Sequence, residues 1–302
     1  MSYIEPKPLQ KGDTIAFIAP AGCVIDKDAI LRAKNYFEES GYKVLFSEHL
    51  FNQNKYMSDT DDNRLSDLHW AFSNPEIDAI ICARGGYGCL RLIDKIDYSL
   101  IKNNPKIFCG YSDITILSAM FLKRANLITY SAPMCRSDFG REGASEENML
   151  SDFTIKSFYK AVTGNELEFK AEKKYKTGNA EGITFGGNLA SVVSLCGIDF
   201  IPDEDFIFFA EDLNEPVYKI DRMFTQLLNI DKFRQNVKGL ILGDFLDSGY
   251  PEQLDELFCD IAKNLNIPAI GGFKITHNKD KITVPYGRYA KIDGETFTVM
   301  QP

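Results

Sequence analysis

Short apolar runs alternate with helical patterns through the first half of the chain, and this alternation constrains the fold more than any other feature. Four apolar runs predict buried strands, at 13–20, 42–47, 77–83 and 106–110. Helical patterns, the first at about 28–40, separate them. Near-continuous apolar strands connected by helices are typical of a parallel sheet covered on both faces. We therefore expect a doubly wound, Rossmann-like α/β domain.

A change in composition near residue 163 predicts where this domain ends. Residues 163–182 are polar, rich in lysine and punctuated by glycine, with no sustained apolar periodicity. After them strand and helix patterns resume, beginning with a glycine-rich turn and an apolar run at 206–212. We expect an N-terminal domain over 1–162, an interdomain linker over 163–182 and a smaller C-terminal α/β domain over 183–302, with the functional site at the domain interface.

Composition argues against several classes of protein. The formal charge of −9 would repel a phosphate backbone, so no nucleic-acid partner is expected. The seven cysteines include no C-x-x-C pair, which argues against a disulfide framework or a zinc site. The N-terminus shows no basic segment followed by an apolar one, and no run approaches the ~18 apolar residues of a membrane span. These features predict a cytoplasmic protein without a membrane partner.

The residues directly after each strand are the most informative, because ligands of such sheets gather at the carboxyl ends of the strands. The sequence GYSD at 110–113 takes an apolar strand into a helix, which places Ser112 at the mouth of the sheet beside unpaired N–H groups. Ser112 is therefore a candidate nucleophile. The competing explanation is helix capping, for which serine and aspartate are favoured. The elbow motif G-x-S-x-G is not met, because Ile114 replaces its second glycine.

A second candidate segment is ARGGYG at 83–88, called the glycine turn below. Its glycines let the backbone approach a ligand, and its N–H groups could point into the cleft from the neighbouring strand end. A phosphate-binding turn is the alternative. The dinucleotide pattern G-x-G-x-x-G would require a third glycine where Arg91 stands, and the chain has no Walker sequence, so a nucleotide site is weakly supported.

A serine nucleophile needs a general base, and the chain offers three histidines. His49 occupies an ordinary loop position and His69 lies beside the apolar stripe of a helix, so packing or exposure explains both. His277 lies in a polar turn between two strand-like runs, where a side chain can point into a cleft. Glu211 follows an apolar strand at the correct sheet end and could orient the imidazole, although spacing alone does not separate it from Asp212. The resulting order of serine, carboxylate and histidine is a permitted one.

Longer blocks around these residues resemble the LD-carboxypeptidase family of serine peptidases, whose members include muramoyltetrapeptide carboxypeptidases and microcin C immunity peptidases. The blocks are KGDTIAFIAPAG (11–22), AIICARGGYGCLRLIDKIDY (79–98), FCGYSDITIL (108–117), GGNLASVVSLCGIDFIP (186–202), FFAEDLNEPVYKIDRMFTQL (208–227) and HNKDKITVPYG (277–287). They occur in the same order as in the family and cover the chain almost from end to end.

The resemblance implies a role for each matching residue. The serine of the G-Y-S-D block maps onto Ser112 as nucleophile, the glutamate of the E-D block onto Glu211, and the histidine before the P-x-G turn onto His277. The oxyanion hole implied by the family uses backbone N–H groups that correspond to Asp113 and Gly86. The family also implies a homodimer, and the reaction it implies needs no metal or organic cofactor.

One departure from the family pattern affects the loop of the base. The family commonly has glycine directly before the histidine, where this chain has Thr276, which restricts the backbone more. A carboxypeptidase must also recognise a free α-carboxylate, for which a planar guanidinium is suited. Arg84 and Arg222 are the candidates, although either could form a structural ion pair instead.

Three functions follow as hypotheses from these residues and from the resemblance. The first is removal of the terminal D-alanine from a muropeptide, after an L-centred diamino acid, in cell-wall recycling. The second is self-immunity by cleavage of a peptidyl- or aminoacyl-nucleotide, which a base-stacking aromatic loop would favour; no such insertion is evident between Pro133 and Ala180. The third is a non-catalytic α/β protein that binds a small molecule.

Overall fold

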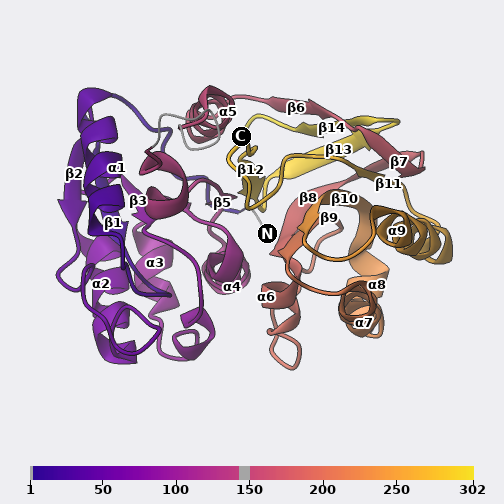
Figure 1. The fold of residues 1–302 in the computed structure, drawn as a ribbon, viewed down its shortest axis with the longest axis horizontal. Coiled ribbons are helices and arrows are strands. Elements are labelled where there is room, and N and C mark those ends of the chain that lie inside the picture. The colour runs from indigo at the N-terminus through magenta and orange to yellow at the C-terminus, as the bar shows by residue number, and fades with distance from the viewer. Residues whose placement is uncertain (1–2, 143–149) are drawn as a thin grey trace.

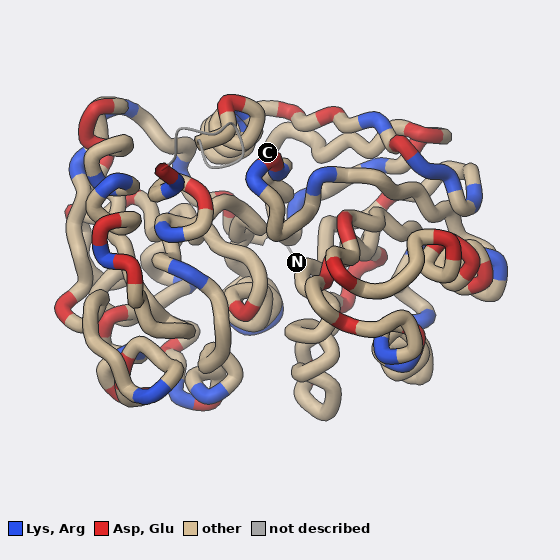
Figure 2. Tube along the Cα trace, viewed as in Figure 1, with Lys and Arg blue, Asp and Glu red and all other residues tan. Residues whose placement is uncertain are grey.

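The chain folds into two α/β domains that lie side by side in Figure 1, each built around one sheet. The computed structural model describes residues 3–142 and 150–302. The predicted two-domain α/β fold is confirmed. Both signs of charge are distributed over the two domains, as Figure 2 shows. No helix within the described ranges combines the length and the apolar character that a membrane crossing requires.

The first sheet has the strand order β12-β5-β4-β3-β1-β2. Strands β1 to β5 run parallel, and only β12 at the edge is antiparallel to its neighbour. Every residue of β1 and β3 is buried, which explains their uninterrupted apolar sequences. The elements are β1 (Thr14–Ile18), α1 (Lys27–Glu39), β2 (Lys43–Phe46), α2 (Asp61–Ser73), β3 (Ala79–Cys82), α3 (Tyr98–Asn103), β4 (Ile107–Cys109), α4 (Thr115–Met120), β5 (Thr129–Ser131) and β12 (Val284–Tyr286).

The second sheet has the order β6-β14-β13-β8-β9-β10-β11-β7. Its centre, β8 to β11, is parallel, and antiparallel strands flank it on both sides. The elements are α5 (Asp152–Val162), β6 (Leu167–Lys170), β7 (Lys173–Lys176), β8 (Asn179–Asn188), α6 (Leu189–Val193), β9 (Phe206–Leu213), α7 (Val217–Leu228), α8 (Asp231–Asn236), β10 (Val237–Leu246), α9 (Pro251–Leu265), β11 (Ala269–Gly271), β13 (Tyr289–Asp293) and β14 (Thr296–Val299).

Residues 163–182 differ from the linker that their composition predicts. They form β6, β7 and the start of β8, all within the second sheet. Strands β6 and β7 are its two edge strands, and lysines on an edge strand discourage pairing with another chain. The polar composition therefore reflects an exposed sheet edge and not a connection between domains.

The last part of the chain returns to the first domain and thereby joins the two sheets. Strand β12 pairs with β5, with Val284 opposite Ser131 and Tyr286 opposite Thr129. The loop between β11 and β12 therefore leads from the second sheet to the first, and β12 lies between the two domains in Figure 1. Helix α4 of the first domain also contacts α6 and β8 of the second.

Candidate active site

Ser112 lies just beyond the carboxyl end of β4, in the turn that leads to α4. Residues Ser112–Ile114 form one 3-10 turn. Ser112 has a φ of +61°, in the left-handed region that residues with a Cβ rarely adopt. Within the described residues, no side-chain hydrogen bond caps either this turn or α4. The hydroxyl of Ser112 is therefore not used as a helix cap, and capping does not account for a serine at this position.

The glycine turn packs directly against this serine. A Cβ on Gly85 would lie 2.8 Å from Ser112 Cβ, so a side chain does not fit there. Gly86 has a φ of +112° and lines a cleft together with Ser112 and Asp113. The Asp113 carboxylate accepts a hydrogen bond of 2.9 Å from the Cys89 N–H, which ties the glycine turn to the serine turn. The two residues expected to supply oxyanion N–H groups thus border the same cleft as Ser112.

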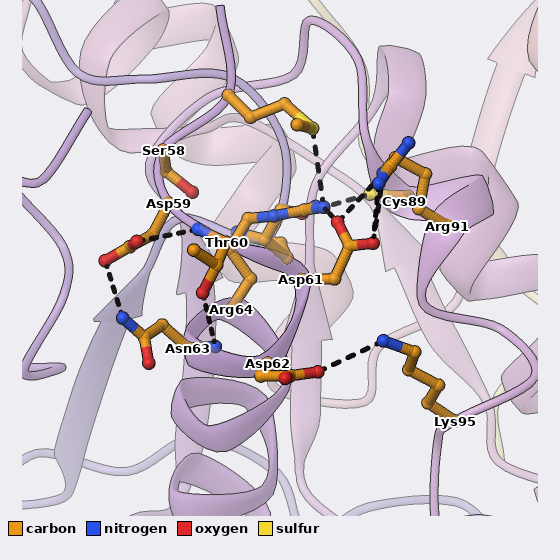
Figure 3. A network of polar contacts seen from close by, with 12 residues as sticks. Ser58, Asp59, Thr60, Asp61, Asp62, Asn63, Arg64, Cys89, Arg91 and Lys95 are labelled. Atoms are coloured by element: carbon orange, nitrogen blue, oxygen red, sulfur yellow. Dashed lines mark hydrogen bonds and ion pairs between the residues drawn. The ribbon is translucent and has the colours of Figure 1, made fainter. Parts of the chain in front are cut away.

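The buried guanidinium of Arg64 lies beside the glycine turn, and Figure 3 shows its contact with Asp61. It donates to the carbonyl of Pro20 at 2.5 Å and to the Asp61 carboxylate at 2.6 Å. A Cβ on Gly88 would lie 2.6 Å from Arg64 Nη1, so the guanidinium occupies the space beside that glycine. Asp61 also accepts a hydrogen bond from Arg91, three residues after the end of the turn. The sequence did not single out Arg64, because the pattern of α2 gives no sign that this arginine is buried.

His277 and Glu211 form a hydrogen-bonded pair at the domain interface. The distance between His277 Nδ1 and Glu211 Oε2 is 2.9 Å, and the side chains are 19% and 3% exposed. Burial lowers the pKa of His277, but the hydrogen bond and charge of Glu211 outweigh this effect, so the pKa is raised above its ordinary value. Since an ionised carboxylate can only accept, we assign the proton to Nδ1, which leaves Nε2 to act as a base.

The loop between β11 and β12 carries His277, and Thr276 fits into it without strain. Thr276 is buried and keeps a negative φ, and its Oγ1 accepts a hydrogen bond of 3.0 Å from the Asn278 N–H. The Tyr111 ring packs edge-on against the His277 ring, with 5.0 Å between the centroids and 72° between the planes. The departure from glycine at position 276 therefore does not prevent the histidine from pairing with Glu211.

Ser112 and His277 line one cleft of about 330 Å³, whose walls come from both domains. Among the described residues, no hydrogen bond joins the Ser112 hydroxyl to the His277 ring. In unliganded enzymes, this kind of contact often forms only when substrate binds. The cleft thus holds the three predicted triad members in or beside it, with the histidine–carboxylate half already joined.

Asp212, the alternative partner for the imidazole, is bound elsewhere. Its carboxylate accepts a hydrogen bond of 2.9 Å from the Ala190 N–H at the start of α6 and one of 3.1 Å from Asn188 Nδ2. Burial raises the pKa of Asp212 to about 6. Asn188 and Asp212 both line the cleft, and no pattern in the sequence marked Asn188 as a site residue. The structure therefore places Glu211, and not Asp212, on His277.

The two arginines predicted to bind a carboxylate occupy different surroundings. Arg84 is half-buried and donates from Nη1 to the carbonyl of Cys23 at 3.1 Å. A Cβ on Gly86 would lie 3.3 Å from Arg84 Nη2, so its guanidinium borders the glycine turn. Arg222 is exposed on α7, with its guanidinium 5.6 Å from the ring centroid of Tyr218. Neither arginine belongs to the described residues that line the cleft.

The other two histidines have partners outside the cleft. His49 Nδ1 lies 2.8 Å from Asp67 Oδ1, and His69 Nε2 accepts a hydrogen bond of 3.0 Å from the Asp97 N–H. Over residues 3–142 and 150–302, no group of three or more His, Cys, Asp or Glu side chains is placed to hold a metal ion.

Comparison with known proteins identifies one family. The family model described as the LD-carboxypeptidase N-terminal domain matches residues 15–132, and the model of the C-terminal domain of the same family matches residues 181–292. A probable murein peptide carboxypeptidase of Bacillus subtilis is 35% identical, over 96% of this chain and 91% of the relative. The microcin C7 self-immunity protein MccF of Escherichia coli is 29% identical, over 94% and 91%. The solved structure of an MccF-like protein from Bacillus anthracis superposes with a TM-score of 0.89 at 27% identity, covering 99% of this chain and 100% of that one. The chain therefore belongs to the LD-carboxypeptidase family.

Proposed function

We propose that this protein is a serine-type LD-carboxypeptidase that removes the terminal D-alanine from murein tetrapeptides, after an L-centred diamino acid. The observation that carries the proposal is the 2.9 Å hydrogen bond between His277 and Glu211, beside the cleft that Ser112 lines. The Bacillus subtilis relative, a probable murein peptide carboxypeptidase, supports murein peptides as the substrate class.

The arrangement supports hydrolysis through an acyl-enzyme. His277 Nε2 takes the proton of the Ser112 hydroxyl while Oγ attacks the scissile carbonyl, and Glu211 stabilises the imidazolium that forms. The N–H groups of Asp113 and Gly86 bind the oxyanion. The imidazolium then protonates the leaving amine of D-alanine, and water clears the acyl-enzyme. General-base assistance is typically worth about 10²–10⁴ in rate, and one oxyanion donor about 10²–10³.

Arg84 is the better placed of the two arginines to bind the terminal carboxylate. Its guanidinium borders Gly86, one of the oxyanion residues, whereas Arg222 lies against Tyr218 on the exposed side of α7. Burial, and to a smaller extent the nearby charge of Arg136, lowers the pKa of Arg84, so an anion that binds there relieves a repulsion between two cations.

The second candidate function is immunity by cleavage of a peptidyl- or aminoacyl-nucleotide. The likeness to MccF and to the MccF-like structure favours it. The described part of the interval 133–180 forms a π-helical turn (Cys135–Phe139), α5, β6 and β7, and residues 143–149 of that interval lie outside the described residues. A murein tetrapeptide and an aminoacyl-nucleotide offered to the same preparation separate the two substrate classes.

The deciding experiment is mass spectrometry of a purified muropeptide tetrapeptide incubated with the wild type, Ser112→Ala and Ser118→Ala. Ser118 is a buried serine of α4 away from the cleft lining, so its variant is the matched control. We expect the wild type and Ser118→Ala to release one alanine and Ser112→Ala to release none. An intact peptide after incubation with folded wild type contradicts the murein proposal. Labelling of Ser112 by a fluorophosphonate probe then separates an enzyme for another substrate from a non-catalytic binding protein.

A further inference from the structure

A buried ion pair lies behind the candidate base and is not used by the proposed mechanism. The side chains of Lys281 and Asp138 are 3% and 1% exposed, and Lys281 Nζ donates to Asp138 Oδ1. Nζ also donates to the Tyr111 hydroxyl at 3.3 Å and lies 4.4 Å from the centroid of that ring. Because desolvation of two charges is expensive, a buried pair is a poor device for stability alone. A role in the site would explain its position better.

The pair connects the loop of the base to the first domain. Lys281 follows His277 by four residues on the loop between β11 and β12, whereas Asp138 belongs to the first domain. Tyr111, the residue directly before Ser112, contacts both Lys281 and His277. Its hydroxyl accepts a hydrogen bond from Lys281, and its ring packs edge-on against the His277 ring. Contacts thus run from the ion pair through one aromatic ring to the imidazole.

The carboxylate of the triad faces the same region. Glu211 Oε1 is buried and has no hydrogen-bond partner among the described residues. Glu211 lines a small pocket together with Tyr111, Thr276 and Lys281. The carboxylate that holds His277 and the buried Lys281 side chain therefore border the same space.

We propose that Lys281 is a positioning residue for the catalytic base, anchored by Asp138 and acting through Tyr111 to hold the His277 ring toward Ser112. This inference rests on the proposed function, because it assigns Lys281 to the same triad. Lys281 does not line the cleft and does not take part in proton transfer. It fixes the orientation of the ring that does.

The charges around His277 give the proposal a signature in pH. Glu211 and Asp212 on β9 raise the pKa of the imidazole, Lys281 lowers it, and Tyr111 is the uncharged neighbour. The base must be neutral to accept the serine proton, so activity rises with pH through this pKa. Removal of the Lys281 charge therefore shifts the acidic limb of kcat/KM to higher pH. A lysine whose charge does not reach the imidazole would leave the limb in place.

The experiment compares Lys281→Met with Lys106→Met, a matched control at another buried lysine, which donates to the Asn74 carbonyl far from the cleft lining. We expect Lys281→Met to lower kcat by about 10²-fold with little change in KM, and to shift the acidic limb upward. Lys106→Met should change neither. If the two variants have the same kcat and the same pH profile, the proposal is overturned.

A double variant separates positioning from stability, because Lys281→Met leaves Asp138 buried without its cation. Lys281→Met combined with Asp138→Asn removes that unpaired charge, so the free energy of unfolding should recover while kcat stays low. Recovery of wild-type kcat would show that the pair is only structural. NMR titration of the His277 ring follows the charge effect without any turnover: its pKa should be higher in Lys281→Met than in the wild type, and an unchanged value overturns the proposal, whereas the kcat of the double variant tests positioning itself. An inactive wild type with a shifted titration would count against the proposed function alone.

Discussion

Replacement of Ser112 by glycine is expected to stabilise the fold relative to replacement by alanine, although both remove the proposed nucleophile. Ser112 adopts a φ of +61°. For a residue with a Cβ, this left-handed conformation costs about 1–2 kcal/mol. Neighbouring structure holds it there, since Asp113 in the same turn is bound to the Cys89 N–H. Strain of this kind often gathers at active-site residues and persists only where the surroundings enforce it.

The magnitude follows from comparing Ser112→Gly with Ser112→Ala, because the two variants differ only in the Cβ. Glycine relieves the left-handed strain, but it also makes the unfolded chain more flexible, which costs about 0.4–1 kcal/mol. The balance leaves Ser112→Gly more stable than Ser112→Ala by about 0.5–1 kcal/mol.

Urea unfolding followed by circular dichroism measures the difference. The control pair is Ser118→Gly and Ser118→Ala in the helical backbone of α4, where glycine is expected to be the less stable by about 1 kcal/mol. Opposite signs at the two serines would locate the strain at Ser112. If Ser112→Gly is no more stable than Ser112→Ala, the argument that this turn stores strain is refuted.

Three further predictions concern the surroundings of the nucleophile and the base. Glu211→Gln should lower kcat by about 10⁴-fold and lower the pKa of His277, which NMR titration can follow because the chain has only three histidines. Gly85→Ala should lower kcat by about 10²-fold and also lower the melting temperature, because the new Cβ would lie 2.8 Å from Ser112 Cβ and 2.9 Å from its Oγ and displace the serine; an unchanged kcat contradicts this. Burial raises the pKa of Asp212 to about 6 in the folded protein. Because the carboxyl of Asp212 loses its proton at lower pH in the unfolded chain, the free energy of unfolding should fall as pH rises from about 4 to about 6. Asp212→Asn should remove that part of the pH dependence, as urea unfolding across this range would show.

Buried elements could be predicted from the sequence because burial on both faces forces an uninterrupted apolar run. The run at 206–212 corresponds to β9, and the run at 13–20 contains β1. Strands β6 and β7, within 163–182, could not be predicted in this way, because most of their residues are not buried. An edge strand shows one face and one row of backbone groups to solvent, so its sequence can be as polar as that of a loop.

Candidate site residues could be selected from the sequence where a strand end or a polar turn marked them. Ser112 and Glu211 follow predicted strands, His277 lies in a polar turn between two strand-like runs, and their catalytic roles stay predictions. The choice between Glu211 and Asp212 required the structure, because neighbouring residues of a strand point in opposite directions. The link from Lys281 to Asp138 spans 143 residues of sequence, and no local pattern records a contact of that range.

The position of His277, the proposed base, on the connection between the two sheets makes the candidate site depend on both domains together. Ser112 and the glycine turn belong to the first domain, and Glu211 belongs to β9 of the second. His277 lies on the loop that leads from β11 to β12, so it is held by Glu211 on one side and, through Lys281 and Asp138, by the first domain on the other. Residues 1–162 expressed alone would keep Ser112, the proposed nucleophile, but would lack His277, Glu211 and the edge strand β12 that pairs with β5. The distance between Ser112 and His277 is therefore set by how the two domains pack, so we expect substitutions at the interface to change kcat even where the proposed triad is intact.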